Sequence, residues 1–217
     1  MTLGLFDDLP ATPQAPEWLE PGAVVLRGFA LPQAAALLQA VDAVTAQAPF
    51  RHLITPGGQR MSVAMSNTGA LGWISDRSGY RYGPSDPTTG QPWPPMPALF
   101  RQLARDAAEA AGYPGFVPDA CLINRYVPGT RLSLHQDRDE GNYDHPIVSV
   151  SLGIPAIFLW GGALRADKAR RVGLWHGDVV VWGGPARLRF HGVAPLADAS
   201  HAMTGGLRIN LTFRKAR

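Results

Sequence analysis

The sequence has one cysteine, few charged residues and no long apolar run. Because Cys121 is the only cysteine among 217 residues, no disulfide can form within the chain. Charge, glycine or proline interrupts every apolar run well before the ~18 residues that a membrane-spanning helix needs. The first ten residues include two aspartates and lack the basic, then apolar pattern of a signal peptide. These absences predict a cytoplasmic protein with no membrane segment.

The composition is that of an ordinary globular protein. Hydrophobic residues make up 46% of the chain and charged residues 17%, which is enough apolar surface for one sizeable core and too little charge for a disordered chain. The 24 glycines and 20 prolines are scattered between short apolar runs and do not form a linker. We therefore expect a single domain over residues 1–217. The net charge of +3 permits a polyanionic partner without requiring one.

Short strands dominate the predicted secondary structure. Helical spacing of apolar residues predicts only two helices, at residues 32–48 and 97–112. Helices come early, and short strands then follow without intervening helices, which favours an antiparallel sandwich or jelly roll over a parallel sheet. The predicted class is mainly β with flanking helices. The candidate strands are residues 23–28, 61–66, 120–127, 131–137, 147–153, 156–160, 171–175, 178–182, 187–194 and 207–214.

A His-x-Asp pattern lies in a segment with strand character. In the run LSLHQD, His135 and Asp137 are two positions apart, and the period of two in a strand would point both side chains to one face. Ferrous oxygenases bind iron through two imidazoles and one carboxylate, which leaves positions open for O2 and a cosubstrate. His191, at the end of a later candidate strand and several strands around a jelly roll, is the candidate third ligand. The predicted metal triad is His135, Asp137 and His191.

A second His-x-Asp pattern, formed by His176 and Asp178, competes with the first. Gly177 and Asp178 separate the apolar runs VGLW and VVVW, a position typical of a hairpin turn whose carboxylate binds nearby backbone. We therefore interpret the second pair as structural. The other histidines have no carboxylate at similar spacing and are interpreted as ordinary polar residues: His52, His145 and His201.

The C-terminal run from Leu207 to Arg214 alternates strictly between apolar and polar residues. An edge strand would expose its polar face to solvent, whereas a strand that closes a jelly roll can turn that face toward a pocket. Arg208 and Arg214 are separated by roughly 20 Å in an extended chain, so a ligand with a carboxylate at each end could engage both. Guanidinium groups bind carboxylates bidentately, which makes this strand suited to a dicarboxylate such as 2-oxoglutarate.

Together these residues resemble the AlkB family of Fe(II)- and 2-oxoglutarate-dependent alkylation-repair dioxygenases, and the likeness extends over most of the chain. The family motifs occur in family order: Asn124-Arg125-Tyr126, His135-Gln136-Asp137, His191 and the alternating strand Arg208–Arg214. The resemblance implies a double-stranded β-helix, that is, a jelly roll, with an N-terminal nucleotide-recognition lid at about residues 50–95. It also implies that His176-Gly177-Asp178 is a turn.

The resemblance further implies how the cosubstrate binds and what the reaction is. Arg208 and Tyr126 would hold the carboxylate of 2-oxoglutarate remote from iron, and Arg214, Asn210 and Asn124 would hold the end that chelates iron. With Fe(II) and O2, the implied reaction is oxidative dealkylation of bases such as 1-methyladenine and 3-methylcytosine. The products would be an aldehyde, succinate and CO2. The implied partner is alkylated single-stranded DNA, with RNA left open.

The resemblance also assigns residues to a pocket for a flipped-out base. Trp73 on the lid would stack on the base, Tyr80 would contact the nucleic-acid backbone, Asp139 would face the exocyclic amine and Arg165 would line the pocket. From pattern alone, the two aromatic residues could equally pack loops, and the two charged residues could be surface charges. Gln59 departs from the tyrosine that some bacterial members carry in the lid, so the lesion preference could differ.

Three alternatives stay open from the sequence. The chain could be a 2-oxoglutarate-dependent hydroxylase of a protein or small molecule. A non-catalytic metal-binding jelly roll of the cupin kind would not need the paired arginines and usually uses more histidines. A non-catalytic nucleic-acid-binding domain would give no reason for the three metal ligands. We expect the protein to be a monomer.

Overall fold

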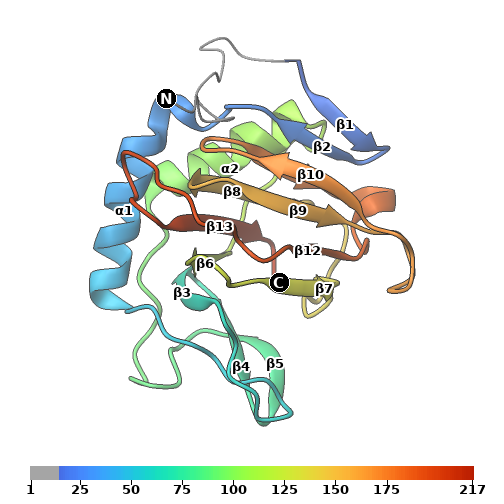
Figure 1. Ribbon diagram of the computed structural model, residues 1–217. Helices are drawn as coiled ribbons and strands as arrows, with labels where there is room; N and C mark the ends of the chain where they lie inside the picture. The colour runs from blue at the N-terminus through green and yellow to red at the C-terminus, as the bar shows by residue number, and fades with distance from the viewer. Residues whose placement is uncertain (1–14) are drawn as a thin grey trace.

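The computed structural model describes residues 15–217, in which two antiparallel β-sheets pack face to face (Figure 1). The larger sheet contains, in spatial order, β1 (Glu17–Glu20), β2 (Ala23–Leu26), β11 (Val179–Trp182), β8 (Ile147–Gly153), β13 (Arg208–Arg214), β6 (Ala120–Tyr126) and β3 (Ala64–Gly69). The smaller sheet contains β10 (Arg170–Leu174), β9 (Ala156–Trp160), β12 (His191–Val193) and β7 (Leu132–His135). This arrangement confirms the predicted mainly β jelly roll with flanking helices.

Two helices cover one face of the larger sheet (Figure 1). Helix α1 (Ala34–Gln47) follows a 3-10 turn that contains Pro32, and helix α2 (Ala98–Ala110) begins directly after Pro97. The apolar side chains of both helices pack with those of the sheet in one continuous core. Both predicted helices are confirmed, each a few residues shorter than expected. Among residues 15–217, no helix is long and apolar enough to cross a bilayer.

The period of two along each strand divides the larger sheet into two environments. Val148, Val150 and Leu211 face the helices, where they are fully buried. The opposite face meets the smaller sheet, and at the β2–β11 end Trp182 packs there with Phe158 and Trp160 in a second apolar core. Toward β13 and β6 the same face becomes polar. The interior of the roll is thus apolar at one end and polar at the other.

Strand β13 is central in the larger sheet. It pairs with β8 on one side and β6 on the other, so its polar face lies inside the roll. Arg208 opposes Tyr126 in the β6 register, and Asn210 opposes Asn124. The edge-strand alternative left open by the sequence is therefore wrong. The alternating pattern reflects a polar interior, and all seven residues of the strand are buried.

A small hairpin stands apart from both main sheets (Figure 1). Its strands, β4 (Gly72–Asp76) and β5 (Gly79–Gly83), pair only with each other. The sequence did not predict these two strands or β1. The bounds of some predicted strands also differ from the structure. The strand at 61–66 forms later, as β3, and the strand at 131–137 ends at His135, as β7. The strand at 187–194 shortens to β12 after a 3-10 turn at Gly184–Ala186.

Candidate active site

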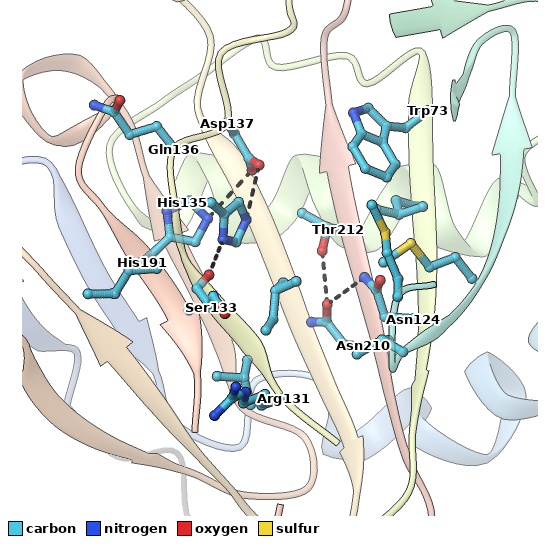
Figure 2. Close-up of a pocket in the computed structure, with 18 of the residues that line it drawn as sticks. Trp73, Asn124, Arg131, Ser133, His135, Gln136, Asp137, His191, Asn210 and Thr212 are labelled. Carbon is cyan, nitrogen blue, oxygen red and sulfur yellow. Dashed lines mark hydrogen bonds and ion pairs between the residues drawn. The ribbon is translucent and has the colours of Figure 1, made fainter. Parts of the chain in front are cut away.

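One cavity of about 670 Å³ opens between the smaller sheet, the polar end of the larger sheet and the hairpin β4–β5. Figure 2 shows its interior, with Trp73 on one wall and the histidines on another. Every residue predicted for metal, cosubstrate or substrate lines it. These residues are Trp73, Tyr80, Asn124, Tyr126, His135, Asp137, Asp139, Arg165, His191, Arg208, Asn210 and Arg214. The structure therefore brings together groups that lie far apart in the sequence.

Two adjacent strands supply the two histidines. His135 ends β7, His191 begins β12, and these residues are directly opposite each other in the antiparallel pair. Their ring centroids are 4.4 Å apart. Gly192 permits this close pairing, because a Cβ added there would lie 2.6 Å from the carbonyl oxygen of Leu132. The expectation that His191 lies several strands away around the roll is wrong, since β12 is the direct neighbour of β7.

Asp137 completes the group from a position two residues beyond β7. Its Oδ1 lies 3.6 Å from His135 Nε2, and its Oδ2 lies 3.7 Å from His191 Nε2 (Figure 2). One ligand atom from each of the three residues lies within 4.8 Å of the others. Strand alternation alone does not place this carboxylate, because the strand has already ended. The two histidines and the carboxylate nevertheless form the donor set typical of a non-haem ferrous site.

Backbone hydrogen bonds fix the tautomers of both histidines. Nδ1 of His135 lies 2.9 Å from the carbonyl oxygen of Ser133, and Nδ1 of His191 lies 3.0 Å from that of Arg189. A carbonyl can only accept, so each Nδ1 carries the hydrogen in the neutral ring. Each Nε2 therefore keeps a lone pair that faces Asp137. This is the arrangement by which proteins present neutral imidazole to a metal ion.

The charges in the site also suit a cation. Burial and the neighbouring His135 ring lower the pKa of His191 to about 3, so this ring is neutral near pH 7. Burial alone would raise the pKa of Asp137, but the Arg214 guanidinium and the two histidines hold it well below its usual range. The carboxylate is therefore ionised. The neutral imidazole of His191 and the anionic carboxylate of Asp137 are in the protonation states that metal binding requires.

The competing pair, His176 and Asp178, has the surroundings of a structural turn. Asp178 Oδ1 accepts from the backbone N–H of Gly28 at 2.9 Å, and Oδ2 accepts from the backbone N–H of Trp175 at 3.0 Å and from Arg27 at 2.6 Å. The His176 ring stacks on His201 with centroids 4.2 Å apart. The second pair thus contributes to the fold, as the sequence interpretation held.

Arg208 is a buried cation with incomplete pairing. It is 1% exposed, its guanidinium carbon lies 4.9 Å from the centre of the Tyr126 ring, and Nη2 donates to Ser151 Oγ at 2.9 Å. Burial lowers the pKa of Arg208, and the nearby Tyr126 opposes that shift. Nε and Nη1 have no partner among residues 15–217. Because a buried charge with unpaired donors is costly, the site favours an anionic ligand. A carboxylate of 2-oxoglutarate fits that requirement.

Polar side chains on three neighbouring strands, among them Asn124, Asn210 and Thr212, form a floor of the cavity (Figure 2). Asn210 Oδ1 accepts from Asn124 at 3.2 Å and from Thr212 at 2.9 Å, and its Nδ2 donates to Ser149 Oγ at 2.8 Å. These bonds fix the orientation of the Asn210 amide. Asn124 Oδ1 has no partner among residues 15–217, although it is buried. The floor therefore holds an acceptor without a partner on β6, the strand that pairs with the one carrying Arg208.

Arg214 lies at the other end of β13, next to the metal ligands. Its Nη2 donates to Asp137 Oδ2 at 2.7 Å, and its Nε does so at 3.0 Å. Burial alone would lower its pKa, but Asp137 and other nearby acidic groups raise it above the usual range. The guanidinium is therefore a fixed positive charge beside the triad. This position agrees with the implied role at the iron-chelating end of the cosubstrate.

The hairpin supplies the aromatic wall of the cavity. Trp73 and Tyr80 stack with ring centroids 5.5 Å apart and planes 13° from parallel. The Trp73 indole N–H donates to Asp139 Oδ2 at 2.8 Å. Arg165 and Gln59 line the same cavity from exposed positions. Trp73 and Asp139, assigned separately to the base pocket, are thus joined by a hydrogen bond.

The sequence interpretation did not select three residues that lie next to the triad: Tyr82, Glu140 and Arg187. Glu140 is buried and binds Tyr82, Arg187 and Arg214. Glu140 follows Asp139 in a charged run, where a solvent-exposed side chain is the ordinary expectation. Only Arg187, which follows a run rich in glycine and apolar residues, had a local signal of burial.

A comparison with protein families defines the class of this chain. The model of the 2OG-Fe(II) oxygenase superfamily matches residues 22–214. Those residues include all four metal and cosubstrate motifs. The jelly roll, the His-Asp-His group and this match together define an oxygenase that uses Fe(II), 2-oxoglutarate and O2.

Individual relatives narrow the class to one family. The chain is 57% identical over 217 residues to the alpha-ketoglutarate-dependent dioxygenase AlkB of Escherichia coli (strain K12), covering 99% of this chain and 98% of that protein. It is 35% identical over 171 residues to an Arabidopsis thaliana protein named DNA N(6)-methyladenine demethylase ALKBH1C, covering 67% of this chain and 38% of that protein. A solved structure, "The structure of OsALKBH1", superposes with a TM-score of 0.82 at 30% identity, covering 93% of this chain and all of that one. The chain belongs to the AlkB family.

Proposed function

We propose that this protein removes alkyl groups from N-alkylated bases of the 1-methyladenine and 3-methylcytosine type in single-stranded DNA. The observation that carries the proposal is one cavity containing three parts: the His-Asp-His group, the unpaired donors of Arg208 and the aromatic wall of the hairpin. The names of the relatives, a dioxygenase and a DNA demethylase, support a nucleic-acid base as substrate.

The residues of the site divide the work between metal and cosubstrate. When bound, Fe(II) and 2-oxoglutarate would supply oxidation of the N-alkyl carbon by O2, with succinate and CO2 as co-products, and the hydroxylated alkyl group would leave the base as an aldehyde. His135, Asp137 and His191 hold the metal. Arg208, with its free Nε and Nη1, holds the carboxylate remote from the metal. Arg214 sets the orientation of Asp137 through two hydrogen bonds.

The base must leave its stack to reach this cavity. The alkylated nitrogen lies on the pairing edge of the base, so it is accessible only after the nucleotide flips out, and a lesion that cannot pair lowers the cost of flipping. Trp73 offers a stacking surface in the same cavity as the histidines, and the carboxylate oxygens of Asp139 are acceptors that suit the exocyclic amine of adenine or cytosine. Single strands should therefore serve well as substrates.

The decisive experiment is incubation with Fe(II), 2-oxoglutarate and a short oligonucleotide that carries 1-methyladenine or 3-methylcytosine. We expect the oligonucleotide to lose the mass of one CH2 unit while succinate accumulates. Succinate without a change in the oligonucleotide would favour a hydroxylase of another substrate. Metal binding without succinate would favour a non-catalytic jelly roll.

We also propose that residues from about 50 to 95 form the nucleotide-recognition lid and that the protein is a monomer. The hairpin β4–β5, which carries Trp73 and Tyr80, supports a lid at about residues 50–95. Stacking on an aromatic residue contributes about 1–3 kcal/mol per base, so Trp73→Ala should raise the KM for the oligonucleotide roughly tenfold or more. An unchanged KM would exclude stacking on Trp73. Sedimentation of the protein alone tests the predicted monomer.

A further inference from the structure

A cluster of buried charges connects the hairpin with the metal triad. On the hairpin side, the Tyr82 hydroxyl donates to Glu140 Oε1 at 2.8 Å. Glu140 is only 5% exposed, and its Oε2 accepts from Arg187 Nη2 at 3.0 Å. Glu140 is therefore a buried charged group that strand β5 contacts directly through Tyr82.

On the triad side, two arginines carry the connection from Glu140 to Asp137. Arg214 Nε lies 3.3 Å from Glu140 Oε1, and Nη2 of the same side chain donates to Asp137 Oδ2. Arg187 Nη1 donates to the backbone carbonyl of Asp137 at 2.7 Å. Both the carboxylate and the main chain of Asp137 are thus held by arginines that Glu140 pairs with.

The hairpin β4–β5 is hydrogen-bonded to two consecutive residues, Asp139 and Glu140. Tyr82 on β5 is the direct partner of Trp73 on β4. Trp73 donates to Asp139, and Tyr82 donates to Glu140. A base that stacks on Trp73 would therefore contact the direct strand partner of Tyr82, the residue that binds Glu140. The aromatic wall and the metal ligand are separated by only a few hydrogen bonds.

The cluster is balanced in charge, with two carboxylates, Asp137 and Glu140, against two guanidiniums, Arg187 and Arg214. All four side chains are less than a tenth exposed. Removal of one charge would leave an unpaired charge in a buried environment, where solvent screens it poorly. Loss of the Glu140 charge in particular would leave excess positive charge beside a site for a divalent cation.

We propose that Glu140 is a positioning residue that links the hairpin β4–β5 to the metal ligand Asp137 through Arg214 and Arg187. The part of this inference that concerns the hairpin depends on the proposed function, because it requires nucleic acid to occupy the aromatic wall. The part that concerns Asp137 does not. Occupation of the wall changes the position of Tyr82, and this change reaches the metal ligands through Glu140.

The test measures metal binding without turnover. Co(II) is titrated into the protein with 2-oxoglutarate in the absence of O2, and its absorption spectrum is recorded with and without a methylated oligonucleotide. Glu140→Gln keeps the shape and an acceptor for Tyr82 but removes the charge. Tyr82→Phe keeps the charge but removes the hydrogen bond. Tyr113→Phe is the matched control, because its hydroxyl donates to Gly22 O at 2.8 Å away from the cavity.

We expect Glu140→Gln to weaken Co(II) binding about tenfold or more, as is usual when a partner of a metal ligand is lost. Tyr82→Phe should bind Co(II) alone with wild-type affinity but lose the spectral change that the oligonucleotide causes. Tyr113→Phe should resemble wild type in both respects. Wild-type Co(II) affinity in Glu140→Gln would overturn the inference. If that variant fails to fold by circular dichroism, Tyr82→Phe decides.

The hairpin part fails if Tyr82→Phe keeps the full spectral response, or if wild type shows none. The proposed function can fail separately. In that case wild type would release no aldehyde from the oligonucleotide, although Glu140→Gln still weakened Co(II) binding. The reverse result, aldehyde from wild type with equal Co(II) affinities, would overturn only the role of Glu140.

Discussion

The chain carries the pattern His-x-Asp twice, and the two copies have opposite hydrogen bonding. At the first copy, Nδ1 of His135 donates to a carbonyl, which leaves the lone pair of Nε2 facing Asp137. At the second, Nδ1 of His176 accepts from the N–H of Gly153 at 2.9 Å, so the hydrogen of the neutral ring is on Nε2. The atom bonded at Nδ1, and not the spacing, decides whether the pair can bind a metal.

Charge pairing does not distinguish the two copies. Asp137 pairs with Arg214, and Asp178 pairs with Arg27. The difference lies in what else surrounds each carboxylate. Asp178 is surrounded by backbone donors of its own turn, whereas Asp137 faces two ring nitrogens and a cavity. A short motif therefore indicates chemistry only together with its neighbours in space.

The largest expected effect comes from removing a metal ligand at the first His-x-Asp pair, which tests the contrast with the second pair directly. His135→Ala or Asp137→Ala should lower aldehyde release at least about 10³-fold, because each removes one of three metal ligands. His176→Ala should keep turnover near the wild-type rate. Aldehyde release and Co(II) titration measure both outcomes. Equal losses from both histidines would show that the wrong pair has been assigned to the metal.

The second prediction tests whether the second His-x-Asp pair contributes to stability and not to turnover. Asp178→Ala should lower the free energy of unfolding by about 3 kcal/mol, since it removes one of the two carboxylates that pair with Arg27 and leaves two partly buried N–H groups without an acceptor. Urea denaturation measures the loss. The fraction that remains folded should turn over at the wild-type rate, and a loss of turnover per folded molecule would argue against a purely structural pair.

A third prediction concerns the unpaired donors found near the first pair. Arg208→Met should raise the KM for 2-oxoglutarate about 10- to 100-fold, the range for loss of a charge-assisted hydrogen bond. The same change should raise the Tm of the protein without ligand, because it removes an incompletely paired buried charge. Exposed Arg105 on α2 provides the control, Arg105→Met. A fall in Tm with unchanged KM would mean that Arg208 serves the fold.

The smallest effect is a pH dependence at the second pair. Burial, together with the adjacent His201, lowers the pKa of His176 from 6.5 to about 4. Between these values the unfolded chain binds more protons than the folded one, so stability falls as the pH decreases from 6.5 toward 4. The ring is half-exposed, so solvent screening should keep its share below about 1 kcal/mol. His176→Gln should flatten the dependence in urea unfolding between pH 7 and 5, and an unchanged slope would assign it to other groups.

The parts of the site that the sequence predicted are those with a local pattern. The strand Arg208–Arg214 alternates within its own length, and Asn124 and Tyr126 are two residues apart on β6, so periodicity alone places each set on one face. Helices α1 and α2 have continuous apolar stripes and were predicted within a few residues. Local patterns thus predicted where strands form but not which strands pair with each other. The direct pairing of β7 with β12 was missed for this reason.

The missed parts depend on contacts between distant segments. The hairpin strands β4 and β5 are short and rich in glycine and polar residues, so they lack the apolar alternation of a core strand. Burial of Glu140 depends on Arg187, which is 47 positions away in the sequence. No local pattern distinguishes such a carboxylate from a solvated one. The same holds for Ser66, Asn67 and Thr68, polar residues that are buried in β3.

The pairing of β13 with β6 has a consequence for how this family can change. Along β13, residues that face the helices alternate with residues that face the cavity. If the pairing with β6 slipped by one position, the arginines would turn toward the apolar core and the leucines toward the cavity. The same strand register therefore builds the core and places the arginines in the cavity. Once the register is set, however, side chains on the cavity face can change while those on the helix face stay constant. Selection can therefore alter which cosubstrate or nucleobase the cavity binds without changing the core.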